Sequence, residues 1–214
     1  MKKRVMLAVI LGVGMILSGC SSESKNTTQP ATVAPATVAD STNAGTSEKE
    51  SANADDFKAE GPVLITSAGQ SADFEMIKVM FDKNELTYSA DSVATEEALG
   101  DCKTLVVAIG GSSKGLGAAG IDADAELERV KKLLTAADEK GITIIAAHIG
   151  GSGRRGKLGD RYIEPTVSMS DYTIVVKAGN EDGLFTTLSE KYSIPMTSVE
   201  NMTDVIPVIG KIFD

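Results

Sequence analysis

One stretch in the second half of the chain restricts the fold more than any other. Residues 141–147 (GITIIAA) form an apolar run rich in β-branched side chains, typical of a strand buried on both faces of a parallel sheet. The next segment, 148–161, is rich in glycine and carries Arg154, Arg155, Lys157 and Arg161. Open α/β sheets bind ligands beyond the carboxyl ends of their strands. This loop is therefore predicted to help bind an anionic group.

The rest of the chain alternates strand and helix patterns around that stretch. Strands are predicted at 62–66, 86–90, 104–109, 141–147, 172–176 and 195–200, and helices at 74–81, 94–99, 122–140, 184–192 and 203–213. Such alternation predicts an α/β fold: a three-layer, doubly wound, mainly parallel sheet of the flavodoxin or Rossmann type. The preferred strand order is 2-1-3-4-5 with a sixth strand at the edge, because 86–90 is short and polar. The order 3-2-1-4-5-6 is the alternative.

The first 56 residues have a different composition. A basic start and an apolar run end in Leu17-Ser18-Gly19-Cys20, which resembles the lipobox of bacterial lipoproteins. The resemblance implies a signal peptide at 1–19 and acylation of Cys20. Residues 20–56 are rich in Ser, Thr, Ala and Pro, predicting a disordered linker ahead of an α/β domain at 57–214. We therefore expect lipid anchoring on the extracytoplasmic face of a cell membrane.

The net charge argues against nucleic acid as a partner. Loss of residues 1–19 removes three of the 21 Lys and Arg and none of the 30 Asp and Glu, which changes the charge from −9 to −12. So acidic a protein is not expected to bind nucleic acid. The expected partners are the bilayer, through acylated Cys20, a small anionic ligand, and a transporter or sensor protein.

Two cofactor motifs match in letters but not in context. Residues 115–120 and 151–156 both fit G-x-G-x-x-G, yet neither lies in the strand-to-helix turn of a dinucleotide site. Residues 151–157 fit the start of a P-loop, but Leu158 stands where Ser or Thr would hold magnesium. His148 is the one histidine of the chain, which excludes a multi-histidine zinc site. No cofactor and no metal are expected.

A hydrolase is the main catalytic alternative. Residues 111–115 fit the nucleophile-elbow pattern G-x-S-x-G with Ser113 at its centre, and His148 ends a neighbouring strand. An elbow requires a helix directly after the serine, whereas a loop is expected up to Asp122. A histidine that only orders its loop is therefore favoured over a catalytic one.

The loops after four predicted strands supply the candidate ligand-binding residues. They combine backbone N–H groups, hydroxyls and cations, a set suited to one anion. The candidates are Ser67, Gln70, Ser71, Gly111, Ser112, Ser113, Lys114, His148, Gly151, Arg154, Arg155 and Asn180. The competing interpretation is that Arg154 and Arg155 pair with nearby carboxylates and stiffen the loop.

Several of these loop sequences together resemble an uncharacterised family of bacterial exported proteins. The resemblance rests on residues 69–73, Gly110-Gly111, residues 154–156 and residues 179–185, and it spans most of 61–214. It implies the fold and a role for the loops, and no activity. Three functions therefore stay open: a lipoprotein that binds a small anionic ligand, a tethered hydrolase, and a non-catalytic interaction module.

Overall fold

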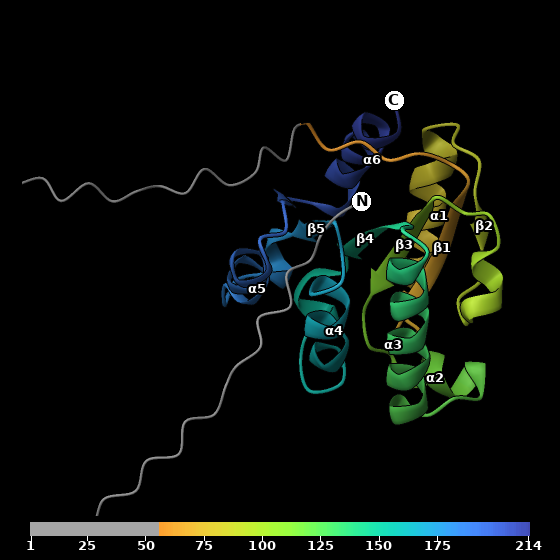
Figure 1. The fold of residues 1–214 in the computed structure, drawn as a ribbon. Helices are drawn as coiled ribbons and strands as arrows, with labels where there is room; N and C mark the ends of the chain where they lie inside the picture. Colours follow the sequence, from red (N-terminus) through yellow and green to blue (C-terminus); the bar gives the residue numbers. More distant parts are fainter. Residues whose placement is uncertain (1–55) are drawn as a thin grey trace, which may run out of the picture. The chain divides into compact units, whose positions relative to one another are not determined.

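The computed structural model describes residues 56–214, which form a six-stranded, all-parallel sheet between two layers of helices (Figure 1). The predicted signal peptide and Cys20 lie outside the described residues, as does all of the predicted linker except Asp56. The strands are β1 (Val63–Ala68), β2 (Ser89–Ala90), β3 (Thr104–Ile109), β4 (Thr143–His148), β5 (Tyr172–Val176) and β6 (Met196–Val199). The α-helices are α1 (Asp73–Lys83), α2 (Ser113–Ala119), α3 (Ala123–Glu139), α4 (Ile163–Val167), α5 (Leu184–Tyr192) and α6 (Val205–Phe213).

The strand order is β2-β1-β3-β4-β5-β6, which confirms the preferred prediction and its sixth strand. The inner strands pair over most of their length; Val63 to Ala68, for example, run beside Thr104 to Ile109. β2 contributes only two residues, both exposed, at one edge. The crossover direction reverses between β1 and β3, where open sheets of this kind bind ligands.

Two apolar cores cover the two faces of the sheet. Alternate strand residues such as Leu105, Val107 and Ile144 pack against α3, α4 and α5. The intervening residues, such as Val106 and Ile145, pack against α1 and α6. Strand side chains point to opposite faces in turn, so a strand covered on both faces must be apolar throughout, as β3 and β4 nearly are.

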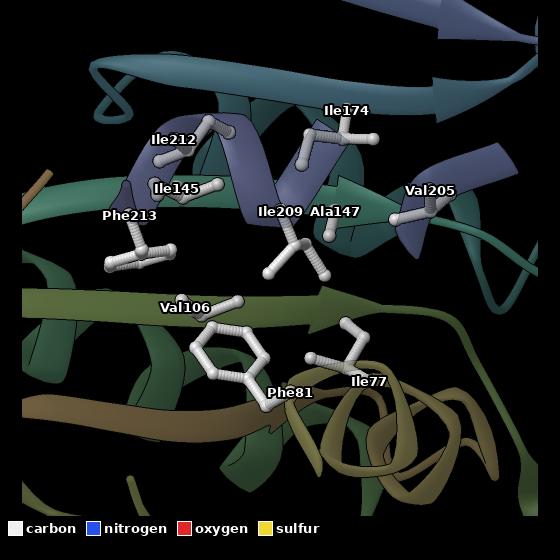
Figure 2. Close-up of a pocket in the computed structure, with 10 residues that line it drawn as sticks. All are labelled: Ile77, Phe81, Val106, Ile145, Ala147, Ile174, Val205, Ile209, Ile212 and Phe213. Carbon is white, nitrogen blue, oxygen red and sulfur yellow. The ribbon is translucent and has the colours of Figure 1, made fainter. Parts of the chain in front are cut away.

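Between α1, α6 and the sheet lies a small apolar cavity, whose walls are shown in Figure 2. Its volume is about 10 Å³, at the lower limit for holding one water molecule, and its ten lining residues are all apolar. Ile77 and Phe81 of α1 line it on one side, and Ile209 of α6 lines it on another. A hollow of this size and lining is a packing gap and not a ligand site.

The segment before β1 lies at the amino edge of the sheet. The ring of Phe57 stacks on Tyr172 at the start of β5, with a centroid distance of 4.4 Å. The Ala59 N–H donates to the carbonyl of Ile212 near the end of α6, over 2.9 Å. Lys103 N–H, just before β3, donates to the Pro62 carbonyl over 2.8 Å. The chain therefore enters the domain at the edge opposite to the carboxyl ends of the strands.

Three short elements differ from the predicted ones. The 94–99 helix is a 3₁₀ turn, η2 (Glu96–Leu99), and the expected loop at 110–121 contains α2. Ser112 caps α2 by accepting from Gly115 N–H over 3.0 Å, and the helix was missed because Gly115 and Gly117 lower its apparent propensity. The unpredicted α4 contains Pro165, which is tolerated because it lies in the first turn, where N–H groups have no helical partner.

No helix among residues 56–214 is both long and apolar enough to cross a membrane.

Candidate functional site

The loops after β1, β3 and β4 interlock at the carboxyl edge of the sheet. Gln70 and Gly111 form an isolated antiparallel bridge that joins the first two loops. A Cβ at position 111 would lie 2.7 Å from the backbone nitrogen of Gly159, so the third loop packs directly on the second. Gly69 adopts φ +102°, and a Cβ there would lie 2.6 Å from the Gly110 carbonyl oxygen. Glycine at positions 69 and 111 permits this close approach.

A buried network from α3 holds the β1 loop in place. The Glu126 side chain is fully buried, and its Oε1 accepts from Gly69 N–H over 2.9 Å and from Gln70 Nε2 over 3.0 Å. Its Oε2 accepts from Arg129 Nε over 2.8 Å. Arg129 also donates to the carbonyls of Ala94 and Ser67, over 2.7 and 2.5 Å. This network holds Gln70 in a left-handed conformation, φ +58°, in the loop after β1.

Beside the interlocked loops, a buried carboxylate anchors Arg154. Asp73, the first residue of α1, has a side chain only 3% exposed, and its Oδ1 accepts from Arg154 Nε over 3.1 Å. Its Oδ2 is buried and has no hydrogen-bond partner among residues 56–214. The Arg154 side chain passes over Gly150, where a Cβ would collide with Arg154 Cγ, and it remains 30% exposed. Neither terminal nitrogen of Arg154 donates a hydrogen bond to any of residues 56–214.

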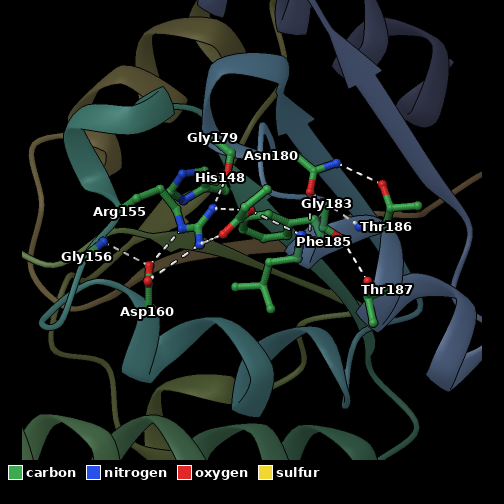
Figure 3. Close-up of polar contacts among 12 residues, drawn as sticks. His148, Arg155, Gly156, Asp160, Gly179, Asn180, Gly183, Phe185, Thr186 and Thr187 are labelled. Carbon is green, nitrogen blue, oxygen red and sulfur yellow. Dashed lines mark hydrogen bonds and ion pairs between the residues drawn. The ribbon is translucent and has the colours of Figure 1, made fainter. Parts of the chain in front are cut away.

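Arg155 has different partners from Arg154 and is enclosed by its own contacts (Figure 3). Its Nε donates to Asp160 over 2.7 Å, and its terminal nitrogens donate to both oxygens of Asp182 over 3.0 and 2.7 Å. One terminal nitrogen also donates to the Gly179 carbonyl over 2.5 Å. The bonds to Asp182 and Asp160 raise the pKa of Arg155 above its ordinary value. Arg155 thus links the β4 loop to the β5 loop.

His148, at the end of β4, is fully buried. Nδ1 lies 3.1 Å from the Ile109 carbonyl oxygen, and Nε2 lies 3.1 Å from that of Gly151. The ring also lies 4.9 Å from the ring of Phe185. Burial lowers the pKa of His148 below 6.5, while the two carbonyls act in the opposite direction and less strongly. Since both ring nitrogens face backbone carbonyls, the imidazole is held as part of the loop structure.

Comparison with known proteins places this fold and its loops in a family. Residues 60–213 match the model of DUF6305, a domain of unknown function. The chain belongs to this family. No curated protein sequence matches the chain. The match confirms the expectation that most of residues 61–214 belong to a family of unknown function.

Solved structures resemble the DUF6305 domain only in fold. A GDSL-like lipase from Bacteroides thetaiotaomicron is 10% identical, with a TM-score of 0.30, over 64% of this chain and 66% of the lipase chain. A psychrotrophic esterase from Pseudoalteromonas sp. is 14% identical, with a TM-score of 0.27, over 64% of this chain and 76% of the esterase chain. At this level of identity and TM-score, neither likeness supports an argument about activity.

The predicted site residues of the DUF6305 domain do not form one cluster. Ser67 and His148, at the ends of β1 and β4, are buried, and so are the loop residues Gln70, Ser71 and Gly151. Asn180 accepts from Phe185 N–H over 2.8 Å and thereby caps α5. Ser113 and Lys114 lie exposed in the first turn of α2, and no hydrogen bond within the described part of the chain joins them to His148 or to either arginine.

Among residues 56–214, no shared partner joins the candidate cations Lys114, Arg154 and Arg155. Arg155 uses its donors on Asp160, Asp182 and Gly179, as the competing interpretation proposed for it. Arg154 is anchored at one nitrogen only, and Lys114 and Lys157 are exposed. No group of three or more potential metal ligands occurs in the described region of the DUF6305 domain.

Three residues that organise the site were not singled out from the sequence. Glu126 and Arg129 lie three residues apart on α3, a spacing that also suits an ordinary pair on a helix surface. Asp73 lies in the first turn of α1, where acidic residues are common for their effect on the helix dipole. The signal available for Asp73 was its place two residues after the loop serine Ser71, whose Oγ accepts from Asp73 N–H over 3.3 Å.

Proposed function

We propose that this protein is a lipid-anchored, extracytoplasmic binding domain, without catalytic activity, that holds a small anionic ligand at the carboxyl edge of its sheet. The N-terminal sequence up to Cys20 supports the anchor. The bound ligand would be retained near the membrane or passed to a transporter or sensor.

The anchoring of Arg154 is the observation that carries the binding proposal. Asp73 fixes Nε of the guanidinium, while the two terminal nitrogens have no hydrogen-bond partner among the described residues. A guanidinium held in this way presents a planar pair of donors suited to a carboxylate or phosphate. Arg154 follows the carboxyl end of β4 and packs over Gly150, and the carboxyl ends of the strands are where sheets of this topology bind ligands.

The surrounding charges and the position of His148 support binding over hydrolysis. Lys114 and Lys157 are exposed in the loops after β3 and β4 and add positive potential to an otherwise acidic protein. Hydrolysis by Ser113 would need a base within hydrogen-bond reach. His148 has both ring nitrogens against carbonyl oxygens and makes no hydrogen bond to Ser113.

The binding proposal is tested with the mature chain, from residue 20 onward, carrying Cys20→Ser so that it is not acylated. Thermal shift against phosphates, nucleotides, amino acids and dicarboxylates finds ligands, since a ligand at one hundred times its Kd adds about 2.7 kcal/mol to the free energy of unfolding. Arg154→Lys retains a cation beside Asp73 but removes the pair of terminal donors. We expect it to weaken binding about tenfold or more, which corresponds to the loss of roughly 1.4 kcal/mol.

Arg161→Lys is the matched control for Arg154→Lys. Arg161 lies in the same segment, pairs with one carboxylate, that of Asp124, and is 31% exposed against 30% for Arg154. The Arg161→Lys variant should bind the ligand with the same affinity as the parent chain. Equal affinity of the Arg154 variant and the parent would refute the proposed site, and an absence of binding across the panel would leave the interaction module as the better hypothesis.

The anchor is tested separately from the ligand. After expression in a bacterial host, the full chain should partition into the detergent phase and incorporate an alkyne-labelled fatty acid, whereas Cys20→Ala should remain aqueous and unlabelled. Equal partitioning of the two chains would contradict lipid anchoring through Cys20.

A further inference from the structure

The guanidinium of Arg155 is held firmly even without Asp182. Asp160 accepts from Nε over 2.7 Å, and the Gly179 carbonyl accepts from one terminal nitrogen over 2.5 Å. The guanidinium also lies over the ring of Phe185, 5.9 Å from its centroid. The Arg155 side chain is 14% exposed. Three separate groups therefore fix the orientation of the guanidinium. Its terminal N–H groups that face Asp182 are not needed for this and could bind another acceptor.

Asp182 is the least enclosed of the groups around Arg155. Its side chain is 57% exposed, compared with 37% for Asp160. It lies in the turn before α5, next to Gly183, which has φ +72°. Asp182 Oδ1 also accepts from Leu184 N–H over 3.2 Å, but α5 is already capped by Asn180, which accepts from Phe185 N–H over 2.8 Å. Release of Asp182 would thus leave both Arg155 and the start of α5 supported.

The contact itself has the geometry of a bound ligand. Both oxygens of Asp182 meet terminal nitrogens of Arg155, at 3.0 and 2.7 Å, in the bidentate arrangement by which arginine binds free carboxylates. A carboxylate from another molecule would find the same two donors and, in addition, the Leu184 N–H. The group that now fills this position is a side chain on an exposed turn.

We propose that Arg155 is a second anchor, specific for a carboxylate, and that Asp182 occupies it in the free protein until a ligand carboxylate replaces it. This inference deepens the proposed function, on which it rests, by naming the chemical class of a ligand group. Asp182 acts as an internal competitor, so the apparent affinity is reduced by the fraction of molecules in which it is bound. Removal of the competitor is therefore expected to increase binding.

Acetate, the smallest suitable carboxylate, is the probe, and the mature chain with Cys20→Ser is the protein. Asp182→Ala leaves an opening the size of a carboxylate beside Arg155. We expect acetate to raise the Tm of this variant more than that of the parent chain, relative to chloride at equal ionic strength. We also expect its affinity for acetate, measured from the NMR signals of the arginine side chains, to be about three- to sixfold higher, as expected for a competing contact worth somewhat less than about 1 kcal/mol.

Glu164→Ala is the matched control, because Glu164 is an exposed carboxylate, 53% accessible, that pairs with Lys191 over 2.8 Å. Acetate should affect this variant and the parent alike. If acetate affects Asp182→Ala no more than Glu164→Ala, Asp182 is an ordinary structural ion pair and the inference is overturned. A response to phosphate as large as that to acetate would overturn the carboxylate specificity.

The two proposals fail separately. If Arg154→Lys loses ligand binding but Asp182→Ala shows no increase in acetate affinity, the anion site at Arg154 stands and Arg155 is not part of it. A gain in Asp182→Ala with unchanged binding in Arg154→Lys would place the anchor at Arg155 alone.

Discussion

Replacement of Glu126 by alanine should destabilise the domain more than any other single change to a charged residue discussed above. Glu126 is fully buried and accepts from Gly69 N–H, from Gln70 and from Arg129. Its loss leaves the guanidinium of Arg129, whose side chain is 9% exposed, without its carboxylate, and leaves the Gly69 N–H without an acceptor.

The size of the effect follows from these two contacts. Removal of one partner of a buried ion pair costs about 3–5 kcal/mol, and a buried N–H without an acceptor costs about 1–3 kcal/mol. Some relaxation of the loop will reduce the total, so we expect a loss of about 4 kcal/mol in the free energy of unfolding. For a domain of this size, such a loss lowers Tm by about 8–16 °C.

Urea unfolding followed by circular dichroism measures this loss, with Glu128→Ala as the matched control. Glu128 is also on α3, but it is 64% exposed and pairs with Lys131 over 3.4 Å, so its removal should change stability by less than about 0.5 kcal/mol. Glu126→Gln, which keeps an acceptor for Gly69 but lacks the charge, should fall between the two. A loss below about 1 kcal/mol in Glu126→Ala would show that the network does not stabilise the β1 loop.

Three further predictions concern the same edge of the sheet. Gly69→Ala should lower the free energy of unfolding by more than about 2 kcal/mol, because φ is +102° and the new Cβ would collide with the Gly110 carbonyl. Gly117→Ala, on an open helix surface, is the control and should raise the free energy of unfolding by roughly 0.5–1 kcal/mol. Similar effects of the two changes in chemical denaturation would contradict this reasoning. The bond from Arg155 lowers the pKa of Asp182 from 3.8 to about 2, so the ion pair stabilises the fold above pH 3.8 and loses this effect as pH falls towards 2. The Tm difference between the parent and Asp182→Ala should therefore shrink over that range, from a gap worth less than about 1 kcal/mol because the carboxylate is exposed; a constant gap would argue against the pair. Burial lowers the pKa of His148 below 6.5, so the unfolded chain binds this proton more readily and stability falls as pH drops below 6.5. His148→Gln should have a flatter Tm profile than the parent between about pH 5 and 7, and equally steep profiles would show that His148 does not contribute to the slope.

The sheet was predictable because its strands are specified locally. The segments 104–109 and 141–147 are apolar at nearly every position, as strands covered on both faces must be. The helix predicted at 122–140 begins with Asp122, a residue type suited to a helix cap, and Asp122 accepts from the N–H groups of Asp124 and Ala125. The polar character of 86–90 predicted an edge strand, and β2 lies at an edge.

The pairing within the site was not predictable, because it depends on how loops distant in sequence come together. Arg155 and Asp182 are 27 residues apart, and Arg154 and Asp73 are 81 apart. The sequence predicts that these loops share one edge, but not which guanidinium meets which carboxylate. The adjacent Arg154 and Arg155 thus have different surroundings: Arg155 is enclosed by its partners, whereas the terminal nitrogens of Arg154 have no partner among the described residues.

The entry of the chain at the amino edge has a consequence for how such a domain is presented. Phe57 and Ala59 bind it beside the start of β5 and the end of α6. Residue 56 therefore lies at the amino edge of the sheet, whereas Arg154 and Arg155 lie in the loop at its carboxyl edge. A soluble molecule can reach the exposed part of Arg154 without passing the point where the chain enters the domain.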